Sequence, residues 1–139
     1  LANAWLSARE WTKAIPPLTK AAEMSEDGGL FLRLGQTYMQ EEDWKNAEKN
    51  IRYAIKKGDL DNPGRAWLLL GITRNKKGIK FENSALFAFK RSTGYDDMEA
   101  DARRWVKVIE AKQARREADR LAAEAAEAEL ADDTIYFNW

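Results

Sequence analysis

The chain has 139 residues, of which 45% are hydrophobic, enough for one domain with a buried core. Its 23 basic and 23 acidic residues give a formal net charge of zero, and it contains neither Cys nor His. These absences exclude disulfide bridges, zinc sites built from Cys and His, and catalysis by a Ser–His or Cys–His pair. Carboxylates, Lys, Tyr, Ser and Thr remain, so these absences do not exclude an enzyme. We nevertheless expect a protein that is not an enzyme, with no catalytic residue, metal site or cofactor.

The spacing of apolar residues predicts an all-α fold of seven helices. Their expected bounds, in chain order, are residues 1–8, 11–24, 30–40, 43–57, 65–76, 81–92 and a long last helix that begins at residue 98. Asp43 stands where a helix needs an N-cap, and the Asp-Asn-Pro-Gly cluster at 61–64 predicts a turn before the next helix. Pro17 is expected to remove a backbone hydrogen bond and to bend the second helix.

Two patterns recur along the chain. An aromatic-x-x-Ala pattern at residues 11–14 returns at 44–47, 33 positions later. An aromatic-x-x-Leu-Gly pattern at 31–35 returns at 67–71, 36 positions later. A period near 34 residues is typical of a helix–turn–helix unit repeated along a chain. The small residues in these patterns, such as Gly35 and Gly71, would allow close approach of packed helices.

The second unit carries the fullest form of this pattern, in Phe31, Leu34, Gly35, Tyr38, Ala47, Ile51 and Ala54. The third carries Trp67, Leu70 and Gly71, with Arg74 where a Tyr is usual. On these residues the chain resembles the tetratricopeptide repeat (TPR) family. The resemblance implies an α-solenoid of about three units over residues 1–97, the first truncated. A long capping and charged helix would follow over 98–131, and then an aromatic tail over 132–139.

In TPR proteins the first helix of each unit lines a concave groove that holds an extended peptide or a partner's helix. Carried over by position, the resemblance implies a groove lined by Asn3, Leu6, Ser7, Leu32, Arg33, Gln36, Met39, Gln40, Arg65, Leu68, Ile72, Asn75, Lys76, Arg103 and Lys107. Such a surface has an apolar floor and a polar, basic rim, which suits a peptide. The alternative is that Leu32, Leu68 and Ile72 only complete the core.

Chaperone-binding TPR domains clamp a C-terminal carboxylate between Lys and Asn side chains. Asn3 and Arg65 match two of those positions, but Arg33 stands where an Asn is expected, so the full clamp is absent. A general peptide-binding co-chaperone or assembly factor nevertheless stays open as an alternative function. An accessory domain of a larger enzyme is the third possibility.

Three phrases, at residues 29–36, 57–72 and 102–110, are more specific. They resemble periplasmic TPR proteins that accompany the TonB–ExbB–ExbD energy-transduction systems of gram-negative bacteria. The resemblance implies a periplasmic scaffold for a protein partner, such as a TonB-system or outer-membrane transport component, with a cytoplasmic location as the alternative. No apolar run approaches the roughly 20 residues of a membrane span, and the first residue, Leu1, suggests a piece of a longer chain.

The zero net charge hides a strong asymmetry. Residues 45–91 hold 12 basic and 4 acidic residues, a net charge of +8, whereas residues 117–133 hold 1 basic and 7 acidic residues, a net charge of −6. The basic region could meet an acidic partner, an anionic membrane or nucleic acid. Nucleic acid is disfavoured, because aromatic residues do not alternate with the basic ones as stacking platforms require.

The aromatic tail has two interpretations. Its large apolar residues, Ile135, Tyr136, Phe137 and Trp139, follow two aspartates and are typical of a short docking motif. The alternative is a terminus that packs locally, or an artificial extension. The long charged helix is expected to be solvated, and it or the tail could mediate self-association.

Overall fold

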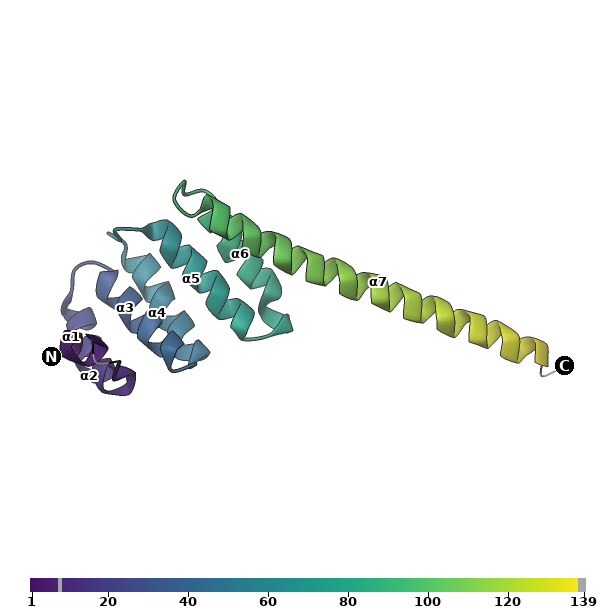
Figure 1. The fold of residues 1–139 in the computed structure, drawn as a ribbon, viewed down its shortest axis with the longest axis horizontal. Helices are drawn as coiled ribbons and strands as arrows, with labels where there is room; N and C mark the ends of the chain where they lie inside the picture. Colours follow the sequence, from purple (N-terminus) through teal and green to yellow (C-terminus); the bar gives the residue numbers. More distant parts are fainter. Residues whose placement is uncertain (8, 138–139) are drawn as a thin grey trace. The chain divides into compact units, whose positions relative to one another are not determined.

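The computed structural model describes the backbone of residues 1–7 and 9–137 and the side chains of those residues up to Thr134. Within this part of the chain every regular element is helical, so the predicted all-α class is confirmed. The elements are α1 (Ala2–Ser7), α2 (Trp11–Met24), α3 (Gly29–Gln40), α4 (Trp44–Lys57), α5 (Pro63–Lys76), a 3-10 turn η1 (Ile79–Phe81), α6 (Glu82–Ser92) and α7 (Glu99–Phe137) (Figure 1).

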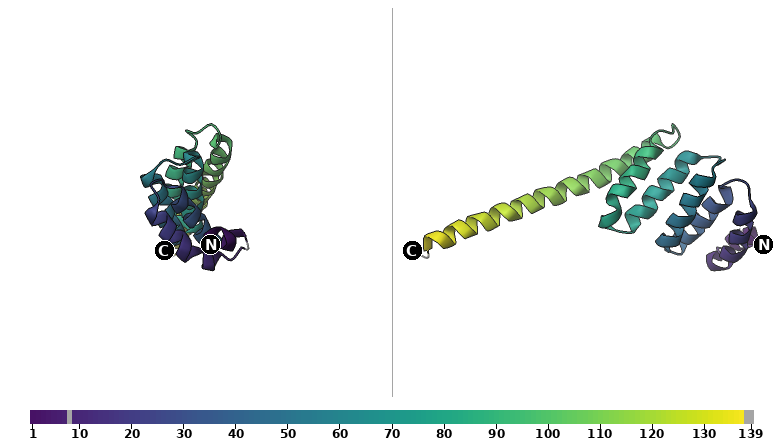
Figure 2. Two further views of the ribbon diagram at one scale, coloured as in Figure 1. Left: turned by 90° about the vertical axis from the view of Figure 1, so that its left-hand side faces the viewer. Right: turned by 180° about the vertical axis from the view of Figure 1, so that it is seen from behind.

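The chain divides into two compact units, residues 1–106 and residues 107–139. In the first unit each helix from α1 to α6 packs against the next one in the chain, and α3 also contacts α5 (Figure 2). The connections between these helices are short, as a row of helices in chain order requires. Functional side chains from helices about 30 residues apart can therefore share one surface.

Helix starts follow local sequence signals. Asp43 caps α4 by accepting a hydrogen bond from the backbone nitrogen of Asn46 at 3.2 Å, which confirms the predicted N-cap. Asn62 caps α5 in the same way, accepting from the backbone nitrogen of Arg65 at 3.0 Å, and Pro63 opens the helix. These caps satisfy N–H groups that have no partner within the helix. The predicted start of α5 at residue 65 was therefore two residues late.

Small residues set the helix spacing in the core. Fully buried alanines include Ala47, Ala54, Ala66 and Ala88. A Cβ added at Gly35 would lie 2.6 Å from Cγ1 of Ile51, so the predicted close approach of α3 and α4 is confirmed. Interiors packed this closely leave no room for even one extra methyl group without movement.

Helix α2 contains both Pro16 and Pro17 in its interior and continues to Met24. Prolines there lack the N–H that the helix uses, so two helical hydrogen bonds are missing. Leu18 and Ala22 are buried just after the prolines, and their packing holds the helix together across this weak point.

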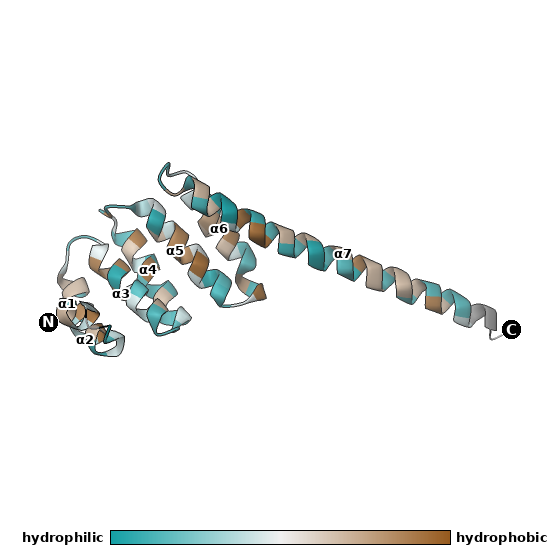
Figure 3. Cartoon of the chain, in the orientation of Figure 1, coloured by the Kyte–Doolittle hydropathy of each residue, from teal (hydrophilic) through white to brown (hydrophobic). Residues whose placement is uncertain are grey.

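The first residues of α7 belong to the first unit. Ala102 is fully buried, and the Trp105 ring stacks on Phe89 of α6 with centroids 5.3 Å apart and planes inclined by 3°. The opening turns of α7 thus pack on α6 through an alanine and an aromatic ring. Hydropathy along α5 and α7 differs clearly, since apolar residues gather on α5 while α7 is mostly hydrophilic or near-neutral (Figure 3).

In the second unit the side chains of residues 114–134 are exposed, as expected for a solvated helix. Arg120 donates hydrogen bonds to Glu117 and Glu124 one turn away on either side. The bond to Glu117, and to a smaller extent the bond to Glu124, raises the pKa of the Arg120 guanidinium. The helix continues to Phe137, six residues beyond its expected end at 131. The side chains of Ile135, Tyr136 and Phe137, and all of Trp139, lie outside the described residues.

Candidate functional site

Three recesses that share Arg33 lie along α3. The first is lined by α3, by the connections at residues 25–27 and 60–62, and by Arg65 at the start of α5, whereas the other two are lined by α1, α2 and α3. Their volumes are about 470, 270 and 330 Å³. All three are lined in part by Arg33, and the first two are also lined by Gln36. Because successive turns of α3 present residues 32, 33, 36 and 40 toward the same side, one helix supplies the centre of the surface.

Arg33 connects two helices across this surface. Its guanidinium donates a hydrogen bond to Oδ1 of Asn3 on α1 at 2.7 Å. Among the described residues no carboxylate pairs with Arg33, and its side chain is exposed. The guanidinium has five N–H donors, so most of them remain directed to solvent and are free to bind an acceptor on a ligand.

The structure brings part of the predicted groove together. The predicted residues that line one or more of the three recesses are Asn3, Leu6, Leu32, Arg33, Gln36, Gln40 and Arg65. They come from three helices and span 62 positions of the chain from first to last. Convergence of this kind is what a row of packed helices provides.

Other predicted groove residues have different surroundings. Met39 packs against the buried cluster of Ile51, Leu70 and Ala88, and Leu32 does so while also lining a recess. Of the three residues for which a core role was the alternative, Leu32 packs against this cluster, whereas Leu68 and Ile72 are half-buried and lie outside it.

The remaining residues of the predicted groove do not line any of the three recesses. They are Ser7, Leu68, Ile72, Asn75, Lys76, Arg103 and Lys107. Lys76 has its ammonium 6.0 Å from the Trp44 ring. Arg103 forms an ion pair with Glu99 on its own helix at 2.8 Å. Lys107 belongs to the second unit.

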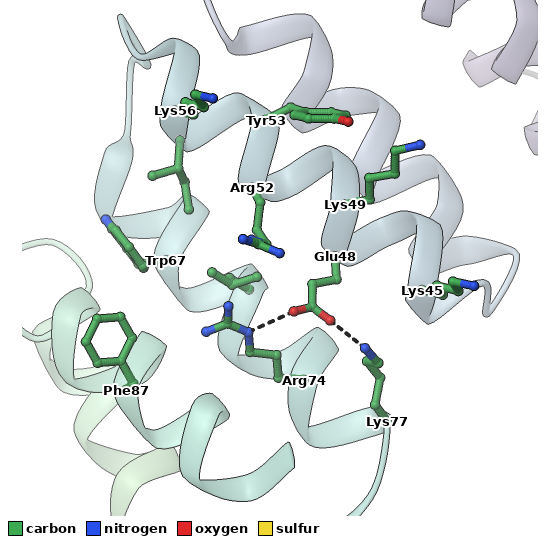
Figure 4. A pocket seen from close by; sticks show the side chains of 12 residues that line it. Lys45, Glu48, Lys49, Arg52, Tyr53, Lys56, Trp67, Arg74, Lys77 and Phe87 are labelled. Atoms are coloured by element: carbon green, nitrogen blue, oxygen red, sulfur yellow. Dashed lines mark hydrogen bonds and ion pairs between the residues drawn. The ribbon is translucent and has the colours of Figure 1, made fainter. Parts of the chain in front are cut away.

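A larger pocket of about 650 Å³ lies on α4, α5 and α6 and was not predicted (Figure 4). Its lining residues are Lys45, Glu48, Lys49, Arg52, Tyr53, Ile55, Lys56, Trp67, Leu70, Arg74, Lys77 and Phe87. The excess of basic residues at 45–91 pointed to this region but not to a surface. The missed signal was the spacing of Lys45, Lys49, Arg52 and Lys56, whose steps of 4, 3 and 4 place them on one face of α4.

Three charged side chains, joined by two ion pairs, form one wall of this pocket. The carboxylate of Glu48 accepts hydrogen bonds from Nε of Arg74 at 3.1 Å and from Nζ of Lys77 at 2.6 Å (Figure 4). Partial burial raises the pKa of Glu48, but the hydrogen bonds from Lys77 and Arg74 outweigh it, so the pKa lies below its ordinary value. Glu48 is therefore ionised at neutral pH, and together with Arg74 and Lys77 it forms a group of net charge +1.

The described part of the chain holds no group of three or more acidic side chains placed to share a metal ion, and none of its helices has an apolar stretch that could cross a bilayer. No protein-family model matches the chain, and no curated protein matches it either.

Proposed function

We propose that this chain is a non-enzymatic scaffold of the TPR type, which binds an extended segment of a protein partner along α3, in the recesses that α3 forms with α1, α2 and Arg65. The observation that carries the proposal is the sharing of Arg33 by three adjoining recesses. A continuous row of recesses can take successive side chains of one peptide, and a central guanidinium can bind its carbonyls or a carboxylate.

The chemistry of the lining residues supports a peptide as the ligand. Leu6 and Leu32 are half-buried and offer apolar contact, while Gln36 and Gln40 can both donate and accept hydrogen bonds. Arg33 and Arg65 are exposed cations at two points of the surface. Peptide-binding surfaces combine an apolar centre with a polar rim in the same way.

The partner and the compartment are proposed from sequence resemblance. The phrases at residues 29–36, 57–72 and 102–110 resemble periplasmic TPR proteins of TonB–ExbB–ExbD systems. We therefore propose a periplasmic scaffold whose partner belongs to that energy-transduction system or to outer-membrane transport.

Site-specific photo-crosslinking in the source cell tests the proposal. A photoreactive residue in place of Gln36 should crosslink a protein partner, whereas one in place of Lys20, exposed on α2, should not. Adding Arg33→Glu should remove the Gln36 crosslink without changing the melting temperature. The same crosslinked proteins from both positions, or none from Gln36, would contradict the proposed groove. Mass spectrometry of the crosslinked band then decides between a TonB-system component and a chaperone or assembly partner.

A further inference from the structure

The pocket on α4, α5 and α6 has an apolar and aromatic interior. Ile55 and Leu70 contribute aliphatic surface, and Trp67 and Phe87 lie together on one side of the pocket (Figure 4). The Phe87 side chain is 56% exposed, an unusual degree for so large an apolar group. Exposed aromatic surface beside a recess is typical of an interaction site.

Unpaired positive charge surrounds this interior. Lys45, Lys49, Arg52 and Lys56 are exposed on α4, and among the described residues none of them forms an ion pair. Like charges three or four positions apart destabilise a helix, and no acid among the described residues forms an ion pair with these four. Glu48, the one acidic residue of the lining, is already engaged by Arg74 and Lys77. The field at the pocket therefore favours an anionic ligand.

A neighbouring recess extends this surface. Its volume is about 560 Å³, and it shares Lys49, Tyr53 and Lys56 with the larger pocket. Glu23 on α2, Phe31 on α3 and Lys57 on α4 complete it, with the Lys57 ammonium 5.3 Å from the Phe31 ring. Two adjoining recesses that share basic residues can hold several consecutive residues of a chain, which exceeds what one small anion would use.

The aromatic rings are arranged for a protein ligand and against nucleic acid. Trp67 meets Phe87 edge to face at 6.1 Å and also has the Arg91 guanidinium 4.9 Å from its ring centre. Tyr53 packs on Phe31 at 5.6 Å. Rings with such contacts make poor platforms for bases. Peptide carboxylates on flexible side chains can reach the lysines while an apolar side chain enters the pocket.

We propose that this face of α4, α5 and α6 is a second binding site, for an acidic peptide segment of a partner protein. Carboxylates of the segment would pair with Lys45, Lys49, Arg52 and Lys56, and an aromatic or aliphatic side chain between them would contact Trp67 and Phe87. This site shares no lining residue with the recesses around Arg33, so the proposal does not depend on the function proposed above.

Selection from a displayed library of random peptides on the full chain tests the proposal. We expect enrichment of sequences with two or more Asp or Glu residues next to a large apolar residue. A labelled peptide from the enriched pool should lose affinity about tenfold on Arg52→Glu/Lys56→Glu and fall further in high salt. The neutral pair Arg52→Gln/Lys56→Gln should give an intermediate loss.

Two controls separate local from general effects. Lys20→Glu/Lys112→Glu makes the same change in net charge at exposed positions outside the pocket and should leave peptide affinity unchanged. Arg33→Glu should also leave it unchanged, which separates this site from the first. The proposal would be overturned if the enriched peptides lack acidic residues, or if the control pair loses as much peptide affinity as the pocket pair. Tighter binding of a single-stranded oligonucleotide than of the peptide would also overturn it.

Discussion

The ring of Phe89 occupies the space that a side chain at Gly71 would need. A Cβ added at Gly71 would lie 2.6 Å from two ring atoms, closer than any real contact between carbon atoms. The same ring is fully buried and stacks on Trp105. One glycine on α5 thus determines how closely α6 approaches it, and through Trp105 the start of α7 depends on the same ring.

Gly71→Ala is expected to destabilise the protein by about 1–3 kcal/mol, because the added methyl group displaces a ring that is held by Trp105. A loss of stability would be informative, since Gly→Ala in an unobstructed helix stabilises a protein by roughly 1 kcal/mol. Urea unfolding followed by circular dichroism measures the difference. An increase in the free energy of unfolding would contradict the packing of α5 on α6.

Phe89→Ala is expected to cost about 3–5 kcal/mol, as the loss of a fully buried aromatic side chain does. Phe87→Ala is the matched control, because Phe87 lies on the same helix with 56% of its side chain exposed. It should change the free energy of unfolding by less than about 1 kcal/mol. Similar losses for the two variants would mean that the rotation of α6 about its axis is wrong.

Asn62→Ala should destabilise the protein by about 1 kcal/mol, since it removes the acceptor for the backbone nitrogen of Arg65 at the start of α5. Asp61→Ala, at the exposed neighbouring position, should have little effect. Both values come from thermal or urea unfolding. If Asp61 proves the more sensitive residue, α5 is capped differently from the structure.

The Glu48 ion pair predicts a pH dependence of stability. The folded-state pKa of Glu48 is lowered from 4.5, so the ionised form is favoured by folding. Its contribution is present above pH 4.5 and is lost as the pH falls through the folded-state pKa. Glu48→Gln should therefore be less stable than the wild type at pH 7, with the difference shrinking at lower pH.

Glu26→Gln serves as the control for that series, because Glu26 is exposed in the connection between α2 and α3. Its unfolding curve should follow the wild type at each pH. A difference between Glu48→Gln and wild type that stays constant from pH 7 to below 4.5 would show that the carboxylate charge is not what stabilises the contact.

Local signals in the sequence were sufficient for the helices. Asp43 and Asn62 cap helices through atoms three residues away, so the information needed lies within a single turn. Gly35 and the buried alanines were recognisable because small residues recur at a period near 34. Tyr38 belongs to the same repeat pattern but is only half-buried, since its burial depends on neighbouring helices.

The candidate sites depended on contacts between distant residues. Arg33 bonds to Asn3 across 30 positions, and Glu48 bonds to Arg74 across 26 positions. Sequence spacing within one helix places residues on a face, but the side that meets another helix is decided by how both helices pack. The larger pocket was missed for this reason, although the basic residues that surround it were visible.

The sequence by itself determined the all-α class, the order and approximate bounds of the helices, and the charge imbalance hidden in a net charge of zero. These properties follow from periodicity, caps and composition, which act over a few residues. Only the tertiary structure decided which charges are compensated. Packing of α4 on α5 brings Arg74 and Lys77 to Glu48, and leaves Lys45, Lys49, Arg52 and Lys56 facing solvent without an acid.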